Sequence, residues 1–210
     1  YIAICEGDDY WTDDQKLQKQ VEFLENNPEF VITYHDAHAF NEVGILKEAQ
    51  LPAKFQCDAD ANDLLNARQI STLTVCFRKV LPEIPFEFDQ APILDLCLWS
   101  LLGSFGKGKY LKSVKPAAYR IHQGGVISSQ NRDNKIRMTM HTYLCLARYY
   151  ARTGNAKLSQ KFTFKTILLG NSQLGKAYRI RLILTEIDII FGGPLNFFKQ
   201  LISSISLRNR

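Results

Sequence analysis

Three carboxylates lie within four residues near the start of the chain, where Glu6, Asp8 and Asp9 follow the apolar residues 1–5. Carboxylates at this spacing repel one another, so we expect a positive charge beside them. Carboxylate oxygens are hard ligands that suit Mg²⁺ or Mn²⁺, and such a cation commonly bridges to a phosphate. The acidic segment therefore predicts a metal or nucleotide site.

A structural interpretation is also open for the acidic residues that come next. Thr12 and Asp13 are good N-cap residues, and Asp13 and Asp14 would favour the first turn of a helix. Capping does not account for the three earlier carboxylates, because they precede the cap and follow a strand-like segment. A short acidic motif is in itself only a hypothesis.

Asp95 is the second candidate, because it stands alone among the apolar residues at positions 93–99. Burying an ionised Asp costs free energy unless the carboxylate is paired. One interpretation is an N-cap for a helix over residues 96–102. The other is a general base, since a poorly hydrated carboxylate at a helix start is suited to take up a proton. The two interpretations are compatible.

Residues 119–129 hold the third constellation, in which Arg120 and His122 precede the paired glycines Gly124 and Gly125. Arg120 offers a planar fork for phosphate oxygens. His122 can complete the coordination of a metal or donate to a phosphate. The glycines allow the backbone to approach a ligand closely. Taken alone, His122 could equally be an ordinary residue of a surface loop.

The remaining candidate residues have weaker support for a functional role. His35 and His38 flank Asp36, but their spacing does not suit a metal site, and on a strand they would point to opposite faces. We therefore predict no metal there. Arg78 could face a substrate or simply end a strand. Trp11 could stack on a sugar, although packing is the commoner role of a Trp at a junction between strand and helix.

The elements that position these residues alternate between strand and helix, which indicates an α/β domain. Residues 13–27 have the apolar spacing of an amphipathic helix, with Lys16 and Lys19 on its outer face. Apolar, β-favouring segments predict strands at residues 1–5, 30–34, 70–79 and 110–114. The first of these has the composition of a buried strand in a parallel sheet, and ligands bind at the carboxyl ends of such strands.

The chain begins without Met and already inside a predicted strand, so we expect a fragment of a longer protein that lacks its first strands. From residue 131 on, the composition is typical of helices. Residues 136–151 and 156–169 predict a helical hairpin, and residues 175–191 and 195–207 predict two further amphipathic helices with basic residues. This basic end could lie on a membrane surface, or pack against its own domain or a partner.

The composition is that of an ordinary globular protein, since 46% of the 210 residues are hydrophobic and 22% are charged. The net charge of +5 is compatible with anionic substrates such as nucleotide diphosphates, or with an anionic membrane surface, and is too small to indicate nucleic acid. Five scattered cysteines without a CxxC pair favour reduced, buried thiols in a cytoplasmic protein.

Taken in order, these motifs resemble the inverting, family-2-like glycosyltransferases of the GT-A fold. Residues 6–11, with the sequence Glu-Gly-Asp-Asp-Tyr-Trp, and residues 16–24 are similar to the family's motif that holds a metal and a sugar-nucleotide diphosphate. Asp95 matches the family's general base, although Leu94 stands where the family more often has an acidic residue or a glycine. Residues 119–129 match a loop that closes over the diphosphate.

The resemblance implies a fold for residues 1–130, which it covers. That fold is an α/β domain of the GT-A type, a Rossmann-like mixed sheet flanked by helices, here without its first strands. Residues 131–210 would form a helical appendage that the resemblance does not cover.

The resemblance also implies an enzyme of polysaccharide or cell-envelope biosynthesis. It would move a sugar, with inversion, from a nucleotide-diphosphate sugar to a glycan or lipid-linked acceptor. The metal, Mn²⁺ or Mg²⁺, would be bound by Asp8, Asp9 and His122. The sugar nucleotide would be bound by Glu6, Asp8, Asp9, Arg120 and His122. Asp95 would be the catalytic base.

Two other functions stay open at this point. One is a non-catalytic module for sugar-nucleotide binding or assembly, and the other is a metal-dependent phosphotransferase or hydrolase built on the same carboxylates. We expect no nucleic-acid partner. The expected location is cytoplasmic, with peripheral contact to the inner face of the membrane through the C-terminal helices.

Overall fold

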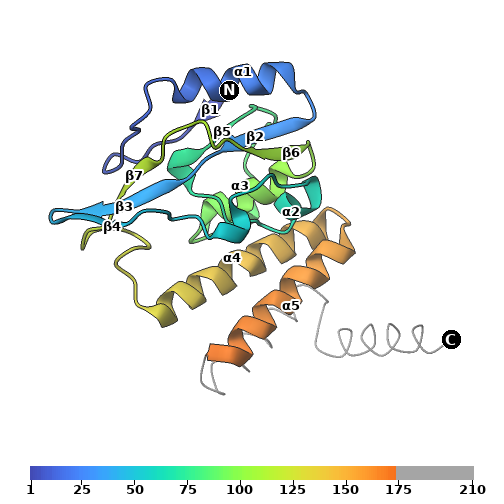
Figure 1. Ribbon diagram of the computed structural model, residues 1–210. Helices are drawn as coiled ribbons and strands as arrows, with labels where there is room; N and C mark the ends of the chain where they lie inside the picture. Colours follow the sequence, from blue (N-terminus) through green and yellow to red (C-terminus); the bar gives the residue numbers. More distant parts are fainter. Residues whose placement is uncertain (174–210) are drawn as a thin grey trace, which may run out of the picture. The chain divides into compact units, whose positions relative to one another are not determined.

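The computed structural model describes residues 1–173, and the two helices expected at residues 175–191 and 195–207 lie outside the described residues (Figure 1). The chain divides into two compact units. The first unit contains residues 1–84 and 93–130 and carries the sheets. The second contains residues 85–92 and the chain from residue 131 onward.

The first unit combines two small sheets with helices, which confirms the prediction of an α/β domain. The strand order of one sheet is β1 (Ile2–Ala3), β5 (Cys76–Phe77), β2 (Phe30–Tyr34) and β6 (Lys107–Tyr110). The order of the other is β4 (Gly44–Lys47), β3 (Ala37–Asn41) and β7 (Ala117–Arg120). Each sheet is mixed, because β2 pairs in parallel with β6 and β3 with β7, while the remaining pairs are antiparallel.

The first strand differs from the prediction for residues 1–5. β1 is two residues long, lies at the edge of its sheet and runs antiparallel to β5. The interpretation as a buried parallel strand is therefore wrong. The apolar residues pair with a strand on one side and stay partly exposed, and Cys5 is exposed.

Residues 70–79 form a 3₁₀ turn and a short strand in place of one long strand. The turn η2 (Thr72–Thr74) precedes β5. The hydroxyl of Thr74 donates to the Ser71 carbonyl at 2.7 Å, and the Thr74 N–H donates to the same oxygen at 3.0 Å. A hydroxyl side chain thus bonds to nearby backbone and closes a turn in a segment of strand-like composition.

The strand predicted at residues 110–114 lies earlier, in β6. Gly108 is part of this strand, and a Cβ atom there would lie 3.1 Å from Cε1 of Tyr34. The glycine therefore allows the strand to pass close to the aromatic ring. Glycines more often indicate a connector, which is why the sequence did not predict a strand here.

Helix α1 (Lys16–Asn26) begins later than predicted, and neither Thr12 nor Asp13 is its N-cap. The carboxylate of Asp13 accepts hydrogen bonds from the Gln15 N–H at 3.0 Å and from the Lys115 N–H at 2.9 Å. Asp13 therefore ties the residues before α1 to a distant loop.

Lys16 lies on the buried face of α1, contrary to the prediction, and is 1% exposed. Its ammonium donates to Gln20 Oε1 at 2.7 Å and to the Val75 carbonyl at 3.3 Å, and lies 4.3 Å from the centroid of the Trp11 ring. Burial lowers the pKa of Lys16 to about 8. The amphipathic pattern misplaced this residue because two of the groups that accommodate its charge, the Val75 carbonyl and the Trp11 ring, lie outside the helix.

The buried Lys16 predicts a stability that increases at alkaline pH. Its pKa of about 8 in the folded chain lies below the ordinary 10.5, so the unfolded chain binds more protons between these values. The free energy of unfolding should therefore rise with pH across that window, and Lys16→Met should reduce the rise. Urea unfolding at about pH 7 and about pH 10 measures the effect. The exposed Lys112 provides a control, Lys112→Met, and an equal rise in both variants would contradict the prediction.

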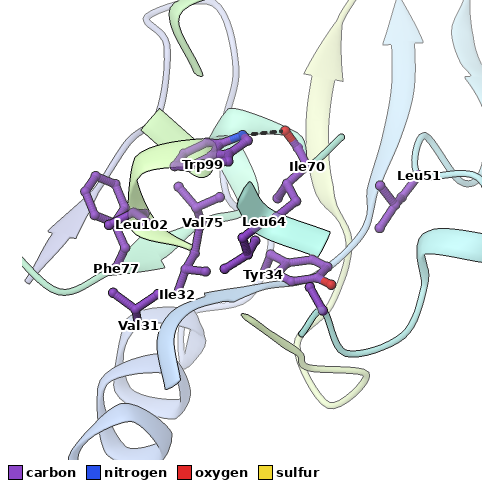
Figure 2. Packing of buried hydrophobic residues seen from close by; sticks show 11 residues of the cluster. Val31, Ile32, Tyr34, Leu51, Leu64, Ile70, Val75, Phe77, Trp99 and Leu102 are labelled. Carbon is purple, nitrogen blue, oxygen red and sulfur yellow. Dashed lines mark hydrogen bonds between the residues drawn. The ribbon is translucent and has the colours of Figure 1, made fainter. Parts of the chain in front are cut away.

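The core of the first unit packs around Trp99 on α3 (Leu94–Leu102), as Figure 2 shows. Trp99 is fully buried, and its indole N–H donates to the Ile70 carbonyl at 3.2 Å. Its ring meets Phe77 edge-on, with 5.8 Å between the centroids. Val75, Leu64 and Leu102 belong to the same cluster. These contacts hold in place the helix that carries Asp95.

The second unit contains the helical hairpin that the sequence predicts, formed by α4 (Arg132–Arg152) and α5 (Ala156–Gln173). Asn131 caps α4 by accepting a hydrogen bond from the Asn134 N–H at 2.9 Å. The 3₁₀ turn η3 (Phe86–Phe88) joins this unit, with the Phe88 ring 5.3 Å from that of Tyr149. In the part of the chain that the structure describes, no helix has both the length and the apolar character needed to cross a membrane.

The structure contains no disulfide between the five cysteines. Cys76, Cys97 and Cys145 are buried, as expected for thiols in apolar segments. Cys5 and Cys57 are exposed, so burial is wrong for these two.

Candidate functional site

The acidic residues form a turn that lies against β7. The Asp9 N–H donates to the Glu6 carbonyl at 3.1 Å and closes the turn. Tyr10 then pairs with Ala118 of β7 through two backbone hydrogen bonds, at 3.2 and 2.9 Å. We call residues 6–9 the acidic turn. The bridge at Tyr10 brings it beside the residues that follow Ala118 in the sequence.

Arg120 joins the acidic turn through both its backbone and its side chain. Its N–H donates to Asp9 Oδ1 at 2.8 Å, and its guanidinium Nε donates to the Asp8 carbonyl at 3.0 Å. The structure therefore brings Arg120 together with two aspartates that the sequence singled out, through the carboxylate of Asp9 and the backbone carbonyl of Asp8.

His122 completes this group by a hydrogen bond with Asp8. The Gly124 N–H donates to Nδ1 of the imidazole at 3.2 Å, so a neutral ring carries its proton on Nε2. Nε2 then donates to Asp8 Oδ2 at 2.7 Å. This bond lowers the pKa of Asp8 below its ordinary value. A Cβ on Gly124 would lie 3.2 Å from His122 Cε1, so glycine permits the loop to fold onto the ring.

The other two carboxylates of the acidic turn have a different electrostatic environment. Burial raises the pKa of Glu6, and the charges of Asp9, Asp95 and Asp8 raise it further. Burial also raises the pKa of Asp9, although the bond from Arg120 opposes this effect. The turn thus concentrates negative charge that a cation would stabilise, as the sequence indicates.

Asp95 lies in the first turn of α3, although not at the N-cap that the sequence predicts. The helix begins at Leu94, and Ile93 takes the cap position. The carboxylate accepts hydrogen bonds from the Thr72 hydroxyl at 2.8 Å and from the Leu96 N–H at 2.7 Å. Burial raises the pKa of Asp95, as expected for a poorly hydrated carboxylate. The negative charge of Asp95 is one of the lesser causes that raise the pKa of Glu6, after burial.

The described residues supply two side chains of the kind that bind Mg²⁺ or Mn²⁺, Asp8 and His122, in direct contact. Asp9 Oδ1 is engaged by the backbone of Arg120. Within residues 1–173, no group of three or more His, Cys, Asp or Glu side chains is arranged to hold a metal. Mg²⁺ is commonly bound by one or two carboxylates together with substrate phosphates, and Asp8 fits that mode. His122 accepts a hydrogen bond at Nδ1 and donates from Nε2, so it could bind a metal only after Nε2 gives up its proton and its bond to Asp8.

Three other candidates take structural roles. The Trp11 indole donates to the Leu73 carbonyl at 2.8 Å, so Trp11 packs, as the alternative interpretation has it. The Arg78 guanidinium donates to the Phe30 carbonyl at 3.0 Å and to the Leu24 carbonyl. His35 is buried and lies apart from the site, and its Nδ1 donates to the Asp36 carbonyl at 2.8 Å.

No role was assigned from the sequence to two residues of the site, Thr72 and Tyr119, although Tyr119 begins the motif at residues 119–129. Thr72 orients Asp95, and nothing in the sequence links these positions because the contact crosses from η2 to α3. Tyr119 has its pKa raised mainly by burial, and the charges of the three carboxylates of the acidic turn add to the effect. The available signal for Tyr119 is its place directly before Arg120.

Thr72 predicts a change in the pH profile of any reaction that uses Asp95 as a base. The Thr72 hydroxyl lowers the pKa of Asp95, so Thr72→Val should raise it further. Since only the ionised carboxylate accepts a proton, the acidic limb of the rate profile should move to higher pH. The measurement is the rate of that reaction against pH. Thr153→Val, at an exposed threonine, is the control, and a limb that stays in place in Thr72→Val would refute the assignment.

No family model matches the chain, and no solved structure matches it. An uncharacterized protein of Mycobacterium bovis and an uncharacterized protein of Mycobacterium tuberculosis are each 38% identical to the chain over 79 residues. The matched segment covers 38% of this chain and 23% of each relative, so the chain spans about a quarter of the length of these curated proteins. Their names give no activity, substrate or partner.

Proposed function

We propose that the chain carries the catalytic part of a glycosyltransferase with a fold of the GT-A type. The enzyme would move a sugar, with inversion, from a nucleotide-diphosphate sugar to a glycan or lipid-linked acceptor. One observation carries the proposal. Two segments far apart in the sequence meet, because β7 brings Arg120 and His122 to the acidic turn, and Asp95 is among the charges that raise the pKa of Glu6.

The donor side of the site is supported by the pairing of acidic and basic groups. The guanidinium of Arg120 and the imidazole of His122 can donate hydrogen bonds to the oxygens of a diphosphate. A bound Mg²⁺ or Mn²⁺ would neutralise charge on the departing diphosphate. Asp8 would hold it together with the diphosphate, and His122 would join them only after Nε2 gives up its proton and its bond to Asp8. Both side chains are partly exposed and therefore accessible.

The acceptor side of the site is supported by the environment of Asp95. This carboxylate is held by Thr72 and the Leu96 N–H and has a raised pKa. In the proposed reaction, Asp95 takes the proton of an acceptor hydroxyl. The hydroxyl oxygen then forms a bond to the anomeric carbon from the face opposite the diphosphate, the bond between that carbon and the diphosphate oxygen breaks, and the nucleoside diphosphate leaves.

Two further functions compete for the same residues. A metal-dependent phosphotransferase or hydrolase commonly uses two metals, which needs a second set of carboxylate ligands. Residues 1–173 show no group of three metal-ligating side chains, so the single Asp8–His122 pair favours the transferase. A non-catalytic binding module would use the acidic turn and Arg120 without needing Asp95 as a base. The transferase proposal includes a cytoplasmic location, at the inner face of the membrane.

The proposal is tested by nucleotide release from a panel of UDP-sugars and GDP-sugars. The full-length protein is incubated with each donor and Mn²⁺, with and without EDTA. We expect release with at least one donor, its loss in EDTA, and a decrease of at least about 10²-fold in Asp8→Asn, because a metal contributes several kcal/mol to such a reaction. Asp133→Asn, at an exposed aspartate of α4, is the matched control.

The other outcomes separate the competing functions. An absence of release with every donor, together with retained binding of a sugar nucleotide, would replace the transferase by the binding module. Release that persists in EDTA and in Asp8→Asn would remove Asp8 and the metal from the mechanism.

A further inference from the structure

An exposed aromatic surface lies directly beside the proposed donor site. The rings of Tyr10 and Phe40 meet edge to face, with 5.4 Å between their centroids. The guanidinium carbon of Arg120 lies 4.6 Å from the centroid of the Phe40 ring. Tyr10 is 48% exposed, although it follows the acidic turn directly and its backbone is fixed to β7. We call Tyr10 and Phe40, with Ile45, the aromatic wall.

Strand register explains why these side chains share one face. Phe40 of β3 is paired with Arg120 of β7 and with Ile45 of β4, and paired residues on neighbouring strands project to the same side of a sheet. The alternate residues Ala37 and Ala39 are fully buried on the other face. Ile45 is 56% exposed, so the wall continues to the edge of the sheet.

The wall is unsuited to a diphosphate, because the faces of aromatic rings carry partial negative charge. The Arg120 guanidinium forms the polar border of the wall, because it contacts both Phe40 and the Asp8 carbonyl. The same guanidinium is one of the proposed phosphate-binding groups. A ligand that fits both parts has an apolar C–H face and a polar edge. A pyranose ring has this character.

We propose that the aromatic wall binds the sugar rings of a glycan acceptor. The wall runs from Tyr10, which pairs with β7, over β3 to β4, and three strand spacings are about 14 Å, which is long enough for a disaccharide. A single donor sugar would not need this length, whereas a growing glycan would. The proposal rests on the transferase function and adds the class of its acceptor, and it places Tyr10, not Trp11, as the ring that contacts sugar.

Saturation-transfer NMR tests this proposal on the full-length protein with four probes, maltose, cellobiose, mannobiose and chitobiose. Irradiating the aromatic protons should transfer signal to the C–H protons of at least one disaccharide. We expect a decrease of about threefold or more in Tyr10→Ala and in Tyr10→Leu, which keeps apolar volume, because both variants lose the aromatic ring on which a sugar would stack. Tyr10→Phe should retain the signal. Val43→Ala, at a residue 92% exposed in the same hairpin, is the control.

Each other result has a defined meaning. Transfer that is absent with all four disaccharides, or equal in Tyr10→Ala and wild type, would overturn the proposal. Tyr10-dependent binding to phosphatidylglycerol vesicles without a disaccharide signal would assign the wall to a lipid surface and also overturn it. Nucleotide release is measured on the same samples, so Tyr10-dependent disaccharide binding without any release would refute the transferase while leaving the glycan site.

Discussion

Replacing Asp95 by Asn should lower the rate constant of sugar transfer by about 10²–10⁴-fold, the usual contribution of a general base. Asparagine keeps the size of the side chain. Its oxygen can accept from the Leu96 N–H and its NH2 can donate to the Thr72 hydroxyl, which can turn to accept, but the amide does not take up a proton at neutral pH. The loss should therefore fall on the chemical step. Binding of the sugar nucleotide should change little, since the groups proposed to bind it lie in the acidic turn, Arg120 and His122.

Stability should not decrease in Asp95→Asn. The raised pKa of Asp95 means that the folded chain holds the proton more tightly than the unfolded chain, so ionisation costs stability as pH rises above the ordinary Asp value. The neutral amide removes that cost at neutral pH. Urea unfolding measured beside the kinetics would separate a catalytic loss from a folding defect.

The exposed Asp14 provides the control variant, Asp14→Asn, in the same unit. Transfer at an unchanged rate in Asp95→Asn would remove Asp95 from the mechanism. A fall in nucleotide binding of the same size as the fall in rate would assign Asp95 to the donor site and leave the reaction without an identified base.

The site was easier to predict than the sheet that supports it. Glu6, Asp8, Arg120 and His122 could be singled out because charged and titratable side chains in short motifs have few structural uses. Their meeting depends on the bridge between Tyr10 and Ala118, which no local pattern in the sequence indicates.

The errors in the fold have the same origin. Residues 70–79 have the composition of a long strand, yet the bonds from Thr74 to Ser71 close a turn within them. Lys16 was placed on the outer face of its helix, since the ring and the carbonyl that accommodate it belong to residues distant in sequence or ahead of the helix. Local propensity indicates which conformations a segment can adopt, and tertiary partners select among them. The hairpin of α4 and α5 was predictable because each helix is long and periodic.

Trp99→Ala should produce the largest loss of stability in the chain's first unit, about 3–5 kcal/mol. The side chain is fully buried against Phe77, and its removal leaves a cavity and an Ile70 carbonyl without its hydrogen bond. Since a domain of this kind is typically stable by about 5–15 kcal/mol, much of the folded population could be lost. Urea unfolding followed by circular dichroism measures the change. Phe105→Ala, at an aromatic residue that is 50% exposed, is the control and should cost far less.

Trp99→Phe tests whether the packing around Trp99 affects the environment of Asp95. Trp99 and Asp95 lie four residues apart on α3, so they share one face of the helix, and both contact the same segment, through the Ile70 carbonyl and the Thr72 hydroxyl. Phenylalanine fills much of the space but donates no hydrogen bond to Ile70. The variant should fold, and its looser contact with this segment should weaken the bond from Thr72 and move the acidic limb of transfer to higher pH, as in Thr72→Val. An unchanged pH profile in a destabilised Trp99→Phe variant would show that Trp99 contributes to stability and does not affect the pKa of Asp95.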